Sequence, residues 1–405
     1  MHAVVKKFGG TSVASVERIH AVADRMIRDF KSGQRPVVVV SAMAGETNRL
    51  VGLATEVYPA YRGPAYDMLL ASGEQVAVSL LTMALESKNQ RARSYLAHQL
   101  NIRTDSSFSK ARILDIETTK LEEDLKNGVI PVVAGFQGVD KDGHVTTLGR
   151  GGSDTTGVAL AAALKLRECE IYTDVPGVFS ADPRLVPRAR EISRLSFEEM
   201  LEMASLGSKV LHSRSVEIGA KHNVRIHVRS TFETREGTWI VPEGEALENP
   251  IVSSVTHETS TSVISAAPIE KGGAVLSDFF SAMAEQNVVI DVISQSDWKE
   301  GQRLAFSVPD EDREIARKIT EKHFSGAKVT VMDQVAKLTI VGVGMRNHPG
   351  VAAKFFKTLS GIGVDVHLVT TSEIKISAII DRQKLASAAQ ALHTHFGLDK
   401  IADKT

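Results

Sequence analysis

The first 230 or so residues alternate short apolar runs with longer amphipathic segments. The run Val37–Val40 is continuously apolar, as in a strand that is buried on both faces of a sheet. An earlier apolar run covers Ala3–Phe8. Between these two runs, apolar residues recur at helical spacing from Val16 to Phe30, which predicts a helix that ends at Gly33 and Pro36. The predicted strands are Ala3–Phe8, Val37–Ser41, Val129–Phe136 and Glu170–Thr173. This pattern predicts an α/β fold with a largely parallel sheet between layers of helices.

Polar, often glycine-rich segments follow each predicted strand. In open parallel sheets, ligands bind at the carboxyl ends of the strands. The predicted rim of a binding site therefore consists of Gly9–Ser12, Ser41–Met43, Gly135–Gly138 and Asp174–Gly177.

A further glycine-rich segment, GRGGSD at 149–154, precedes the apolar helical run Thr155–Leu166. A helix N-terminus presents unpaired N–H groups and partial positive charge, and Arg150 could clamp a carboxylate or phosphate. The simpler interpretation is a capped turn with Ser153 or Asp154 as N-cap.

The segment KFGGTS at 7–12 is not a Walker A loop, because its lysine precedes the glycines. Its ammonium and N–H groups could still face a phosphate. Taken alone, Lys7 could equally be a solvated turn lysine.

The sequence changes character at 231–262, which is rich in Thr, Glu, Gly and Pro, and we predict a domain junction there. Beyond it, Ile264–Gln295 aligns without gaps onto Ile340–Thr371 at an offset of 76 residues. Each copy has the pattern strand, turn, helix, strand. The repeat is either a paired ligand-sensing module or a duplicated packing or dimerisation module.

Composition narrows the functional classes. The 405 residues are 43% hydrophobic and 24% charged with a net charge of −1, which disfavours nucleic acid as a partner. No uninterrupted apolar run is long enough for a membrane span, and the N-terminal segment has no signal-peptide pattern. The single cysteine, Cys169, cannot form an internal disulfide and is predicted to be buried. We expect a cytoplasmic protein with neither a membrane nor a nucleic-acid partner.

The motifs together resemble those of the aspartate kinases, which belong to the amino acid kinase superfamily and carry two C-terminal ACT domains. The resemblance runs in family order from about residue 3 to 397. It rests on KFGGTS (7–12), VVVVSAM (37–43), LLASGE (69–74), VAGFQG (133–138), TTLGRGGSDTT (146–156), EIYTDVPGVFSADPR (170–184), LSFEEMLEMASLGSKVLHSRSVE (195–217) and TTSEIKIS (370–377).

The resemblance implies a fold and a domain arrangement. It implies a three-layer sandwich with a largely parallel central sheet, the amino acid kinase fold, followed by two ferredoxin-like α+β ACT domains. The expected boundaries are 1–245 for the catalytic domain, 262–335 for the first ACT domain and 336–400 for the second.

The resemblance also implies phosphoryl transfer from ATP, with Mg²⁺, to the side-chain carboxylate of aspartate. Because that nucleophile is already ionised, cations and N–H groups are needed rather than a general base. The expected catalytic residues are Lys7 and Asp154. Arg150 is expected on the α-carboxylate of aspartate and Glu74 on its α-ammonium, and the substrate set is completed by Ser41, Thr47, Gly151, Gly152 and Ser153. The expected ATP contacts are Lys7, Phe8, Gly9, Gly10, Thr173, Asp174, Phe179, Arg184, Lys209 and Val210.

For the ACT pair, the resemblance implies feedback control by lysine and/or threonine and a homodimer or larger homo-oligomer formed through these domains. The expected effector contacts are Asp291, Gln295, Asn347, His348, Pro349, Gly350, Ser372 and Glu373. No protein ligand to the metal is assigned, and His212, His222 and His227 are expected to be surface or packing residues. Two other readings are an acetylglutamate or glutamate 5-kinase and a non-catalytic amino-acid sensor.

Overall fold

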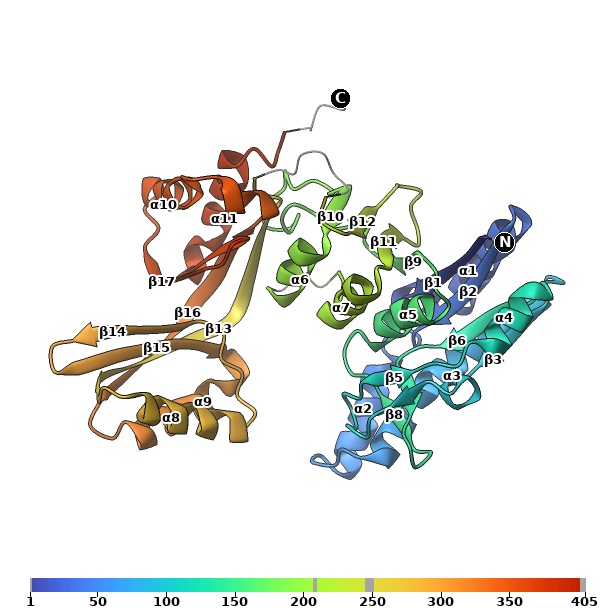
Figure 1. Ribbon diagram of the computed structural model, residues 1–405, viewed down its shortest axis with the longest axis horizontal. Coiled ribbons are helices and arrows are strands. Elements are labelled where there is room, and N and C mark those ends of the chain that lie inside the picture. The colour runs from blue at the N-terminus through green and yellow to red at the C-terminus, as the bar shows by residue number, and fades with distance from the viewer. Residues whose placement is uncertain (1, 207–209, 245–250, 401–405) are drawn as a thin grey trace. The chain divides into compact units, whose positions relative to one another are not determined.

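A computed structural model describes residues 2–206, 210–244 and 251–400 of the chain (Figure 1). The chain forms two compact units, which we describe separately. Among the described residues, the first unit comprises 2–178, 191–205 and 210–244, and the second comprises 179–190, 206 and 251–400.

The first unit is built on an eight-stranded sheet in the order β10-β12-β11-β9-β1-β2-β6-β3. All its pairings are parallel except the one between β11 and β12. The strands are β1 (His2–Phe8), β2 (Gln34–Val40), β3 (Ala92–Tyr95), β6 (Ile130–Ala134), β9 (Glu168–Thr173), β10 (Arg194–Ser196), β11 (Arg225–Ser230) and β12 (Thr238–Val241). The largely parallel sheet predicted from the apolar runs is confirmed.

Helices pack on the two faces of this sheet. On one face, α1 (Val16–Lys31) and α3 (Pro64–Glu86) share a core with apolar residues of β1, β2 and β6. On the other, α5 (Gly152–Ala163) packs on β1 and β9 and against α7 (Ser213–His222). The remaining helices of the unit are α2 (Glu46–Val57), α4 (Thr119–Lys126) and α6 (Phe197–Ser205).

A small four-stranded sheet in the order β5-β4-β7-β8 flanks the main sheet of this unit. Its strands are β4 (Arg103–Thr104), β5 (Ile113–Asp115), β7 (Gln137–Val139) and β8 (Val145–Thr147).

The helix α3 has the length and apolar composition of a membrane span. One apolar side of it, however, including Val78, Leu81 and Leu85, lies in the core of the first unit, and two buried carboxylates, Asp67 and Glu74, are part of the same helix. We therefore describe α3 as a core helix, since a helix that is covered by its own sheet passes the same composition test as a membrane span.

The second unit contains a six-stranded antiparallel sheet in the order β14-β15-β13-β16-β18-β17. Its strands are β13 (Ser254–Ile269), β14 (Ile293–Trp298), β15 (Gly301–Pro309), β16 (Lys328–Val341), β17 (Val366–Thr371) and β18 (Lys375–Asp381). Its helices are α8 (Gly273–Glu285), α9 (Arg313–His323), α10 (Val351–Gly361) and α11 (Leu385–His395). Helices α8 and α9 lie side by side on one part of the sheet (Figure 1).

The long strands β13 and β16 each contribute to both copies of the repeat. Residues 261–267 of β13 pair with 328–335 of β16 in the first copy, and residues 254–258 pair with 337–341 in the second. The expected ACT boundaries at 262, 335 and 400 remain predictions. The structure adds that a strand segment preceding residue 262 completes the sheet of the second copy.

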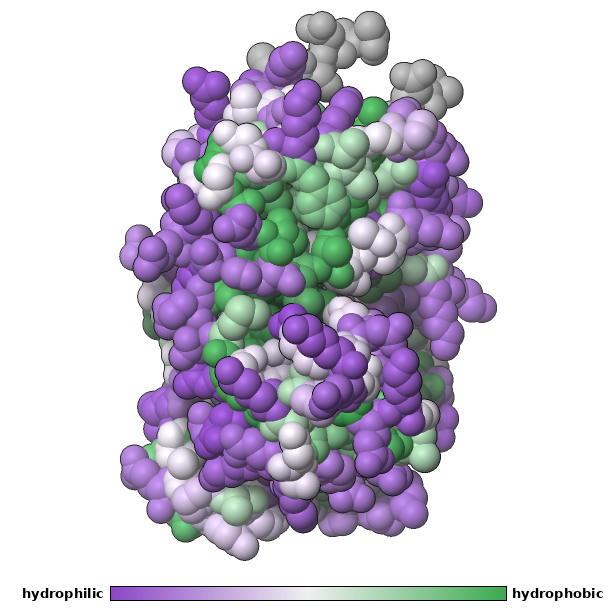
Figure 2. Space-filling model, turned by 90° about the vertical axis from the view of Figure 1, so that its left-hand side faces the viewer, coloured by the Kyte–Doolittle hydropathy of each residue, from purple (hydrophilic) through white to green (hydrophobic). Residues whose placement is uncertain are grey.

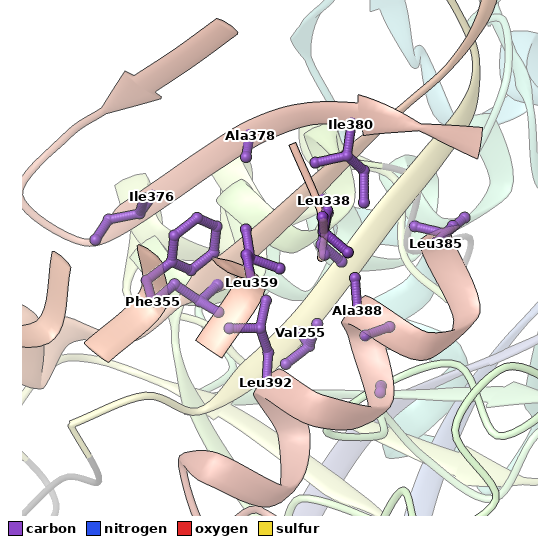
Figure 3. Close-up of a cluster of buried hydrophobic side chains, with 14 of the residues drawn as sticks. Val255, Leu338, Phe355, Leu359, Ile376, Ala378, Ile380, Leu385, Ala388 and Leu392 are labelled. Carbon is purple, nitrogen blue, oxygen red and sulfur yellow. The ribbon is translucent and has the colours of Figure 1, made fainter. Parts of the chain in front are cut away.

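Each copy has its own apolar core, with one fully buried phenylalanine at the equivalent helix position. Phe279 of α8 lies in the first core and Phe355 of α10 in the second. Figure 3 shows Phe355 and Leu359 of α10 pointing toward Ile376 of β18 and Leu392 of α11. The internal repeat inferred from the sequence is therefore present as two packed modules.

The segment Phe179–Arg190 belongs to the second unit, although the resemblance assigns two of its residues, Phe179 and Arg184, to ATP binding. Ala181 and Val186 lie in the same apolar core as α10 and α11. The Ser180 hydroxyl and Nε2 of His393 in α11 form a buried hydrogen bond of 2.8 Å. This segment is thus anchored in the core of the second module.

Candidate active site

Lys7 and Asp154 form a nearly buried ion pair. The Lys7 Nζ atom lies 2.5 Å from Asp154 Oδ1, and the two side chains are 10% and 12% exposed. Lys7 is the penultimate residue of strand β1, and Asp154 is in the first turn of helix α5. Gly157 of α5 leaves room for the lysine, because a Cβ there would lie 3.2 Å from Lys7 Cβ. The two residues expected to be catalytic are therefore in contact.

The loops that follow β1, β2 and β9 are joined by backbone hydrogen bonds. Gly9 N–H donates to the Tyr172 carbonyl over 3.1 Å, and Ala44 N–H donates to the Gly10 carbonyl over 3.2 Å. At Gly10, a Cβ would lie 2.7 Å from the carbonyl oxygen of Ala42, so only glycine fits without a shift of the backbone. These contacts fix the backbone at the carboxyl edge of the sheet, where the predicted rim lies.

Phe8 contributes to this edge through its backbone. Its side chain is fully buried and stacks on the ring of Tyr172, with 4.7 Å between the ring centroids. The ring thus belongs to the core on the α1 face.

Glu74 is a buried carboxylate with only one satisfied oxygen. Its Oε1 atom accepts a hydrogen bond of 3.0 Å from Ala42 N–H. Its Oε2 atom is buried without a hydrogen-bond partner among the described residues, and the residue is 2% exposed. Burial raises the pKa of Glu74 to about 8, and the Ala42 hydrogen bond offsets only part of that rise. Such a carboxylate needs either a proton or a cationic ligand.

The turn before α5 uses left-handed glycines, with φ of +77° at Gly149 and +65° at Gly151. The helix starts at Gly152, and Gly151 is its N-cap without a side-chain cap. The capped-turn interpretation, with Ser153 or Asp154 as N-cap, is therefore wrong. Both residues lie inside the first helical turn instead, and Asp154 is thereby directed at Lys7.

Ser153 and Gly152 contact the loop that follows β6. A Cβ on Gly135 would lie 2.8 Å from both Cβ and Oγ of Ser153, and one on Gly152 would lie 2.7 Å from the ring of Phe136. This third loop of the predicted rim therefore packs closely against the start of α5.

The start of α7 supports the same turn. The guanidinium group of Arg214 donates to the carbonyls of Leu148 (2.5 Å) and Ala111 (2.8 Å). His212 packs so closely on Gly151 that a Cβ on the glycine would lie 2.1 Å from His212 Cβ. Burial lowers the pKa of His212, and the positive charges of Arg214 and Arg150 lower it further, which favours a neutral ring.

Arg214 was not predicted as a site residue. His212 was expected to be a surface or packing residue, and the structure places it in packing contact with Gly151 of the predicted substrate loop. The sequence analysis had no further expectation for either residue. It also missed Asp67, a fully buried residue of α3 that accepts hydrogen bonds from Ser109 N–H and Thr147 N–H. Burial raises the pKa of Asp67, although these hydrogen bonds lower it. A signal was available in the spacing, because Asp67 and Glu74 are seven residues apart in an otherwise apolar helix and so share a face.

The remaining predicted substrate and nucleotide residues of the first unit lie in loops or at the ends of helices and strands. Ser41 and Thr47 are half-buried, Thr47 in the first turn of α2, and Arg150 is exposed. The Thr173 hydroxyl donates to Asp174 Oδ1 over 3.2 Å at the end of β9. Val210 is half-buried in a turn, and Lys209 lies outside the described residues.

Phe179 and Arg184 are described with the second unit. The guanidinium of Arg184 forms two hydrogen bonds with the Asp182 carboxylate, of 3.0 and 2.7 Å. The Arg184 side chain is nevertheless 89% exposed. An ATP contact for either residue remains a prediction.

In the first module, the predicted effector residue Asp291 is already paired. The ammonium of the buried Lys337 contacts both Asp291 and Glu258, the latter at 2.8 Å. Burial alone would lower the pKa of Lys337, but the two carboxylates outweigh it and raise the pKa. Gln295 on β14 is exposed, and its amide bonds to Gln302.

In the second module, the predicted effector residues lie on two neighbouring turns. Glu373, in the hairpin between β17 and β18, pairs with Arg346 at 3.1 Å. Arg346 precedes the exposed turn 347–350, in which His348 Nδ1 lies 2.7 Å from the Gly344 carbonyl and Gly350 has φ of +93°. In the same hairpin, Ser372 N–H donates to the Lys375 carbonyl. The structure thus brings the Asn347–Gly350 turn and the Ser372–Glu373 hairpin together.

One group of possible metal ligands, Asp140, Asp142 and His144, occurs among the described residues. It lies in the turn between β7 and β8, where Asp140 Oδ1 accepts hydrogen bonds from the N–H groups of the other two residues. This carboxylate therefore closes a turn, and the group includes none of the predicted site residues.

Two known families match parts of this chain. Residues 2–230 match the model of the amino acid kinase family, and residues 338–396 match that of an ACT domain. The chain is 45% identical over 408 residues to an aspartokinase of Pseudomonas aeruginosa, and 43% identical over 403 residues to aspartokinase 2 of Bacillus subtilis. Each alignment covers 99% of both chains.

Solved structures show the same fold. Aspartokinase III of E. coli, crystallised with aspartate and ADP, superposes with a TM-score of 0.81 at 24% identity, covering 97% of this chain and 99% of that one. The aspartate kinase of Synechocystis is 41% identical, with a TM-score of 0.55, over 97% of this chain and 69% of that one.

The fold and the two family matches are those of an ATP-dependent amino acid kinase that carries a C-terminal ACT domain. Within that class, the near-complete coverage by its relatives shows that the chain belongs to the aspartate kinase family.

Proposed function

We propose that this protein transfers the γ-phosphoryl group of ATP to the side-chain carboxylate of L-aspartate and yields 4-phospho-L-aspartate. The observation that carries the proposal is the unpartnered Oε2 of the buried Glu74. Its other oxygen binds Ala42, whose carbonyl lies against Gly10 in the loop that follows Lys7. The Glu74 carboxylate is thus linked through the backbone of Ala42 to the loop that follows Lys7.

The charges suit a carboxylate nucleophile. Two anions must approach each other, and the ammonium of Lys7 with the N–H groups of Gly9 and Gly10 would offset the charge on the transferring group. Asp154 holds Lys7 in place through the ion pair of 2.5 Å. Bound with the nucleotide, Mg²⁺ would supply further positive charge, and the exposed Asp174 is the predicted ATP residue whose carboxylate suits it.

Two opposite charges would select the amino acid. Glu74 would accept the α-ammonium, and the exposed Arg150 would clamp the α-carboxylate. N-acetylglutamate has no ammonium group, so Glu74 disfavours an acetylglutamate kinase. The intact Lys7–Asp154 pair likewise disfavours a sensor without catalytic activity.

A hydroxamate assay with ATP and Mg²⁺ tests the substrate. Hydroxylamine traps the acyl phosphate, and we expect signal with aspartate and little with glutamate or N-acetylglutamate. Equal signal from N-acetylglutamate, or none from aspartate, contradicts the proposal.

We propose that the reaction is the first step toward lysine, threonine and methionine, and that lysine and/or threonine inhibits it through the two modules. The paired turns of the second module, Asn347–Gly350 and Ser372–Glu373, would bind the effector, with Asp291 and Gln295 contributing from the first. Rates titrated with lysine, threonine and both together test this, and a rate indifferent to both across millimolar concentrations contradicts it.

We also propose that the protein works in the cytoplasm as a homodimer or larger homo-oligomer formed through the ACT modules. Figure 2 shows a green apolar area, framed by purple hydrophilic side chains, on one face of the molecule. Independently, the edge strands β14 and β17 carry exposed apolar residues, Ile293, Trp298 and Val369. Exposed edge strands with apolar side chains favour pairing. Light scattering after size-exclusion chromatography should give a multiple of 43.8 kDa, and a monomer at micromolar concentration contradicts this proposal.

A further inference from the structure

A second basic site lies on the α1 face of the first unit, the face opposite to Lys7. It is a cavity of about 130 Å³ beside the end of β1. Its lining includes Arg18, Arg25 and Arg28 of α1, with Ser12, Thr231 and Phe232 from two loops. The three arginines are spaced by seven and three residues, so they share one side of the helix.

Two of the guanidinium groups are held in place by neutral partners. Arg25 lies 4.8 Å above the Tyr172 ring and donates to the Thr231 carbonyl over 3.4 Å. Arg18 lies 4.7 Å from the Phe232 ring and donates to the Thr11 carbonyl. These contacts fix the planes of both groups but neutralise neither charge.

Two acids of the same helix are engaged elsewhere, and the third, Glu17, is exposed in the first turn. Asp24 pairs with Lys88 at 2.7 Å, and Asp29 pairs with Lys6 at 2.7 Å. Across residues 2–206, 210–244 and 251–400, none of the three arginines has a carboxylate within ion-pair distance. Like charges three residues apart on a helix repel, so an anion between them would be stabilising.

The cavity also offers hydroxyl groups. Ser12 Oγ, which is fully buried, lies 2.6 Å from Thr231 Oγ1. The two hydroxyls share one hydrogen between them, which leaves the second free to donate to a ligand. A cavity needs only about 10–15 Å³ of such volume to hold one water molecule, so 130 Å³ has room for a tetrahedral oxyanion.

We propose that this arginine cavity binds a phosphate group, either as inorganic phosphate or as the phosphoryl group of a small metabolite. Arg25 and Arg28 supply the charge and the two hydroxyls a neutral donor. Because Arg18 also holds the Thr11 carbonyl, a bound phosphate would tighten the loop that begins at Gly9. The proposal does not depend on the identity of the amino-acid substrate.

Isothermal titration calorimetry with inorganic phosphate tests the site in the full-length protein. Saturating Mg²⁺, aspartate and a non-hydrolysable ATP analogue keep phosphate out of the catalytic edge. We expect one phosphate per chain with a millimolar Kd in the wild type. The double variant Arg25→Gln/Arg28→Gln should raise the Kd at least tenfold, and Lys31→Gln, a neutralised exposed lysine of the same helix, should leave it unchanged.

No binding up to 50 mM phosphate, or an equal Kd in the double variant, overturns the proposal. If the double variant does not fold by circular dichroism, Arg28→Gln alone replaces it, because Arg28 is exposed, and a several-fold weaker Kd is then expected. Glycerol phosphate titrated in parallel distinguishes the sources. Tighter binding than phosphate assigns a phosphorylated metabolite, and weaker binding assigns the free ion.

Discussion

The two faces of β1 carry consecutive buried lysines with different surroundings. Lys6, on the α1 face, is 2% exposed and lies 2.7 Å from Asp29 and 3.0 Å from Glu170. Lys7, on the α5 face, has the one carboxylate of Asp154 and lies beside the glycine loop. Burial alone would lower the pKa of Lys6, but Glu170 and Asp29 outweigh it and raise the pKa.

Under the proposed function, Lys6 serves the fold and Lys7 serves a ligand. Two carboxylates within 3.0 Å satisfy Lys6 without any further partner. Lys7 retains donor capacity toward the edge where Glu74 also has an unpartnered oxygen. In that proposal, incomplete pairing of buried charge, rather than burial itself, distinguishes the edge that binds the substrates.

Lys7→Met should give the largest effect. Loss of the ammonium removes charge from the transferring phosphoryl group, so we expect kcat to fall by about 10³-fold, roughly 4 kcal/mol. Coupled steady-state assays at saturating aspartate measure this. A rate within threefold of the wild type would remove Lys7 from the reaction.

Lys6→Met is the matched variant on the other face. It leaves Asp29 without its cation and Glu170 with only Arg229, at 3.4 Å, so we expect about 3 kcal/mol lower stability toward urea. The kcat of the folded fraction should stay within a fewfold of the wild type. If Lys6→Met abolishes kcat in folded protein, the division of roles between the two lysines fails.

Glu74→Gln should weaken aspartate binding while the fold persists. The amide keeps the hydrogen bond from Ala42 but loses the charge for the α-ammonium, so KM for aspartate should rise about 30-fold, roughly 2 kcal/mol. Glu86→Gln, at the exposed end of the same helix, serves as control and should leave KM unchanged. An unchanged KM in Glu74→Gln contradicts the assignment.

The affinity for aspartate should depend on pH through Glu74. Its pKa of about 8 in the folded, ligand-free protein means that the carboxyl is largely protonated at pH 7. Because the α-ammonium binds the ionised form, KM should fall about tenfold per unit from pH 6 to 7 and level off above 8. For the same reason, stability of the ligand-free protein should decline between pH 4.5 and 8, as folding favours the protonated carboxyl. Profiles of KM against pH in Glu74→Gln should lose this slope.

The smallest effect is expected at the exposed ion pair of the second module. Arg346 and Glu373 are 31% and 79% exposed, so Glu373→Gln should change stability by less than about 1 kcal/mol. Inhibition by lysine or threonine should weaken severalfold, because that pair joins the two proposed effector turns. Asp297→Asn, which breaks the equivalent pair with Lys271 in the first module, provides the comparison.

Much of the fold was predictable because apolar runs and helical spacing act locally. The predicted helix Val16–Phe30 and the four predicted strands lie within one or a few residues of the observed elements. The helix predicted at 155–166 starts three residues earlier, because left-handed Gly151 rather than a polar side chain caps it. Nothing in the local pattern showed that β13 and β16 run through both modules, since strand pairing is a long-range property.

Residues of the candidate site that belong to the motifs of the resemblance could be predicted. Residues that reach the candidate site only through tertiary packing could not. Lys7 and Asp154 are 147 positions apart, and only the resemblance linked them before the structure showed the contact. Asp67 and Arg214 act on backbone groups of distant loops, so single-residue patterns carried little signal. The arginine cavity needs α1 and the loop at Thr231 together, which no local spacing indicates.

Proton release on aspartate binding tests the central claim most directly. Titration calorimetry at pH 7, repeated in buffers of different ionisation enthalpy, counts the protons released. The Glu74 assignment predicts that about one proton leaves per aspartate bound in the wild type and none in Glu74→Gln. Wild-type binding without proton release, or equal release in both proteins, would contradict it.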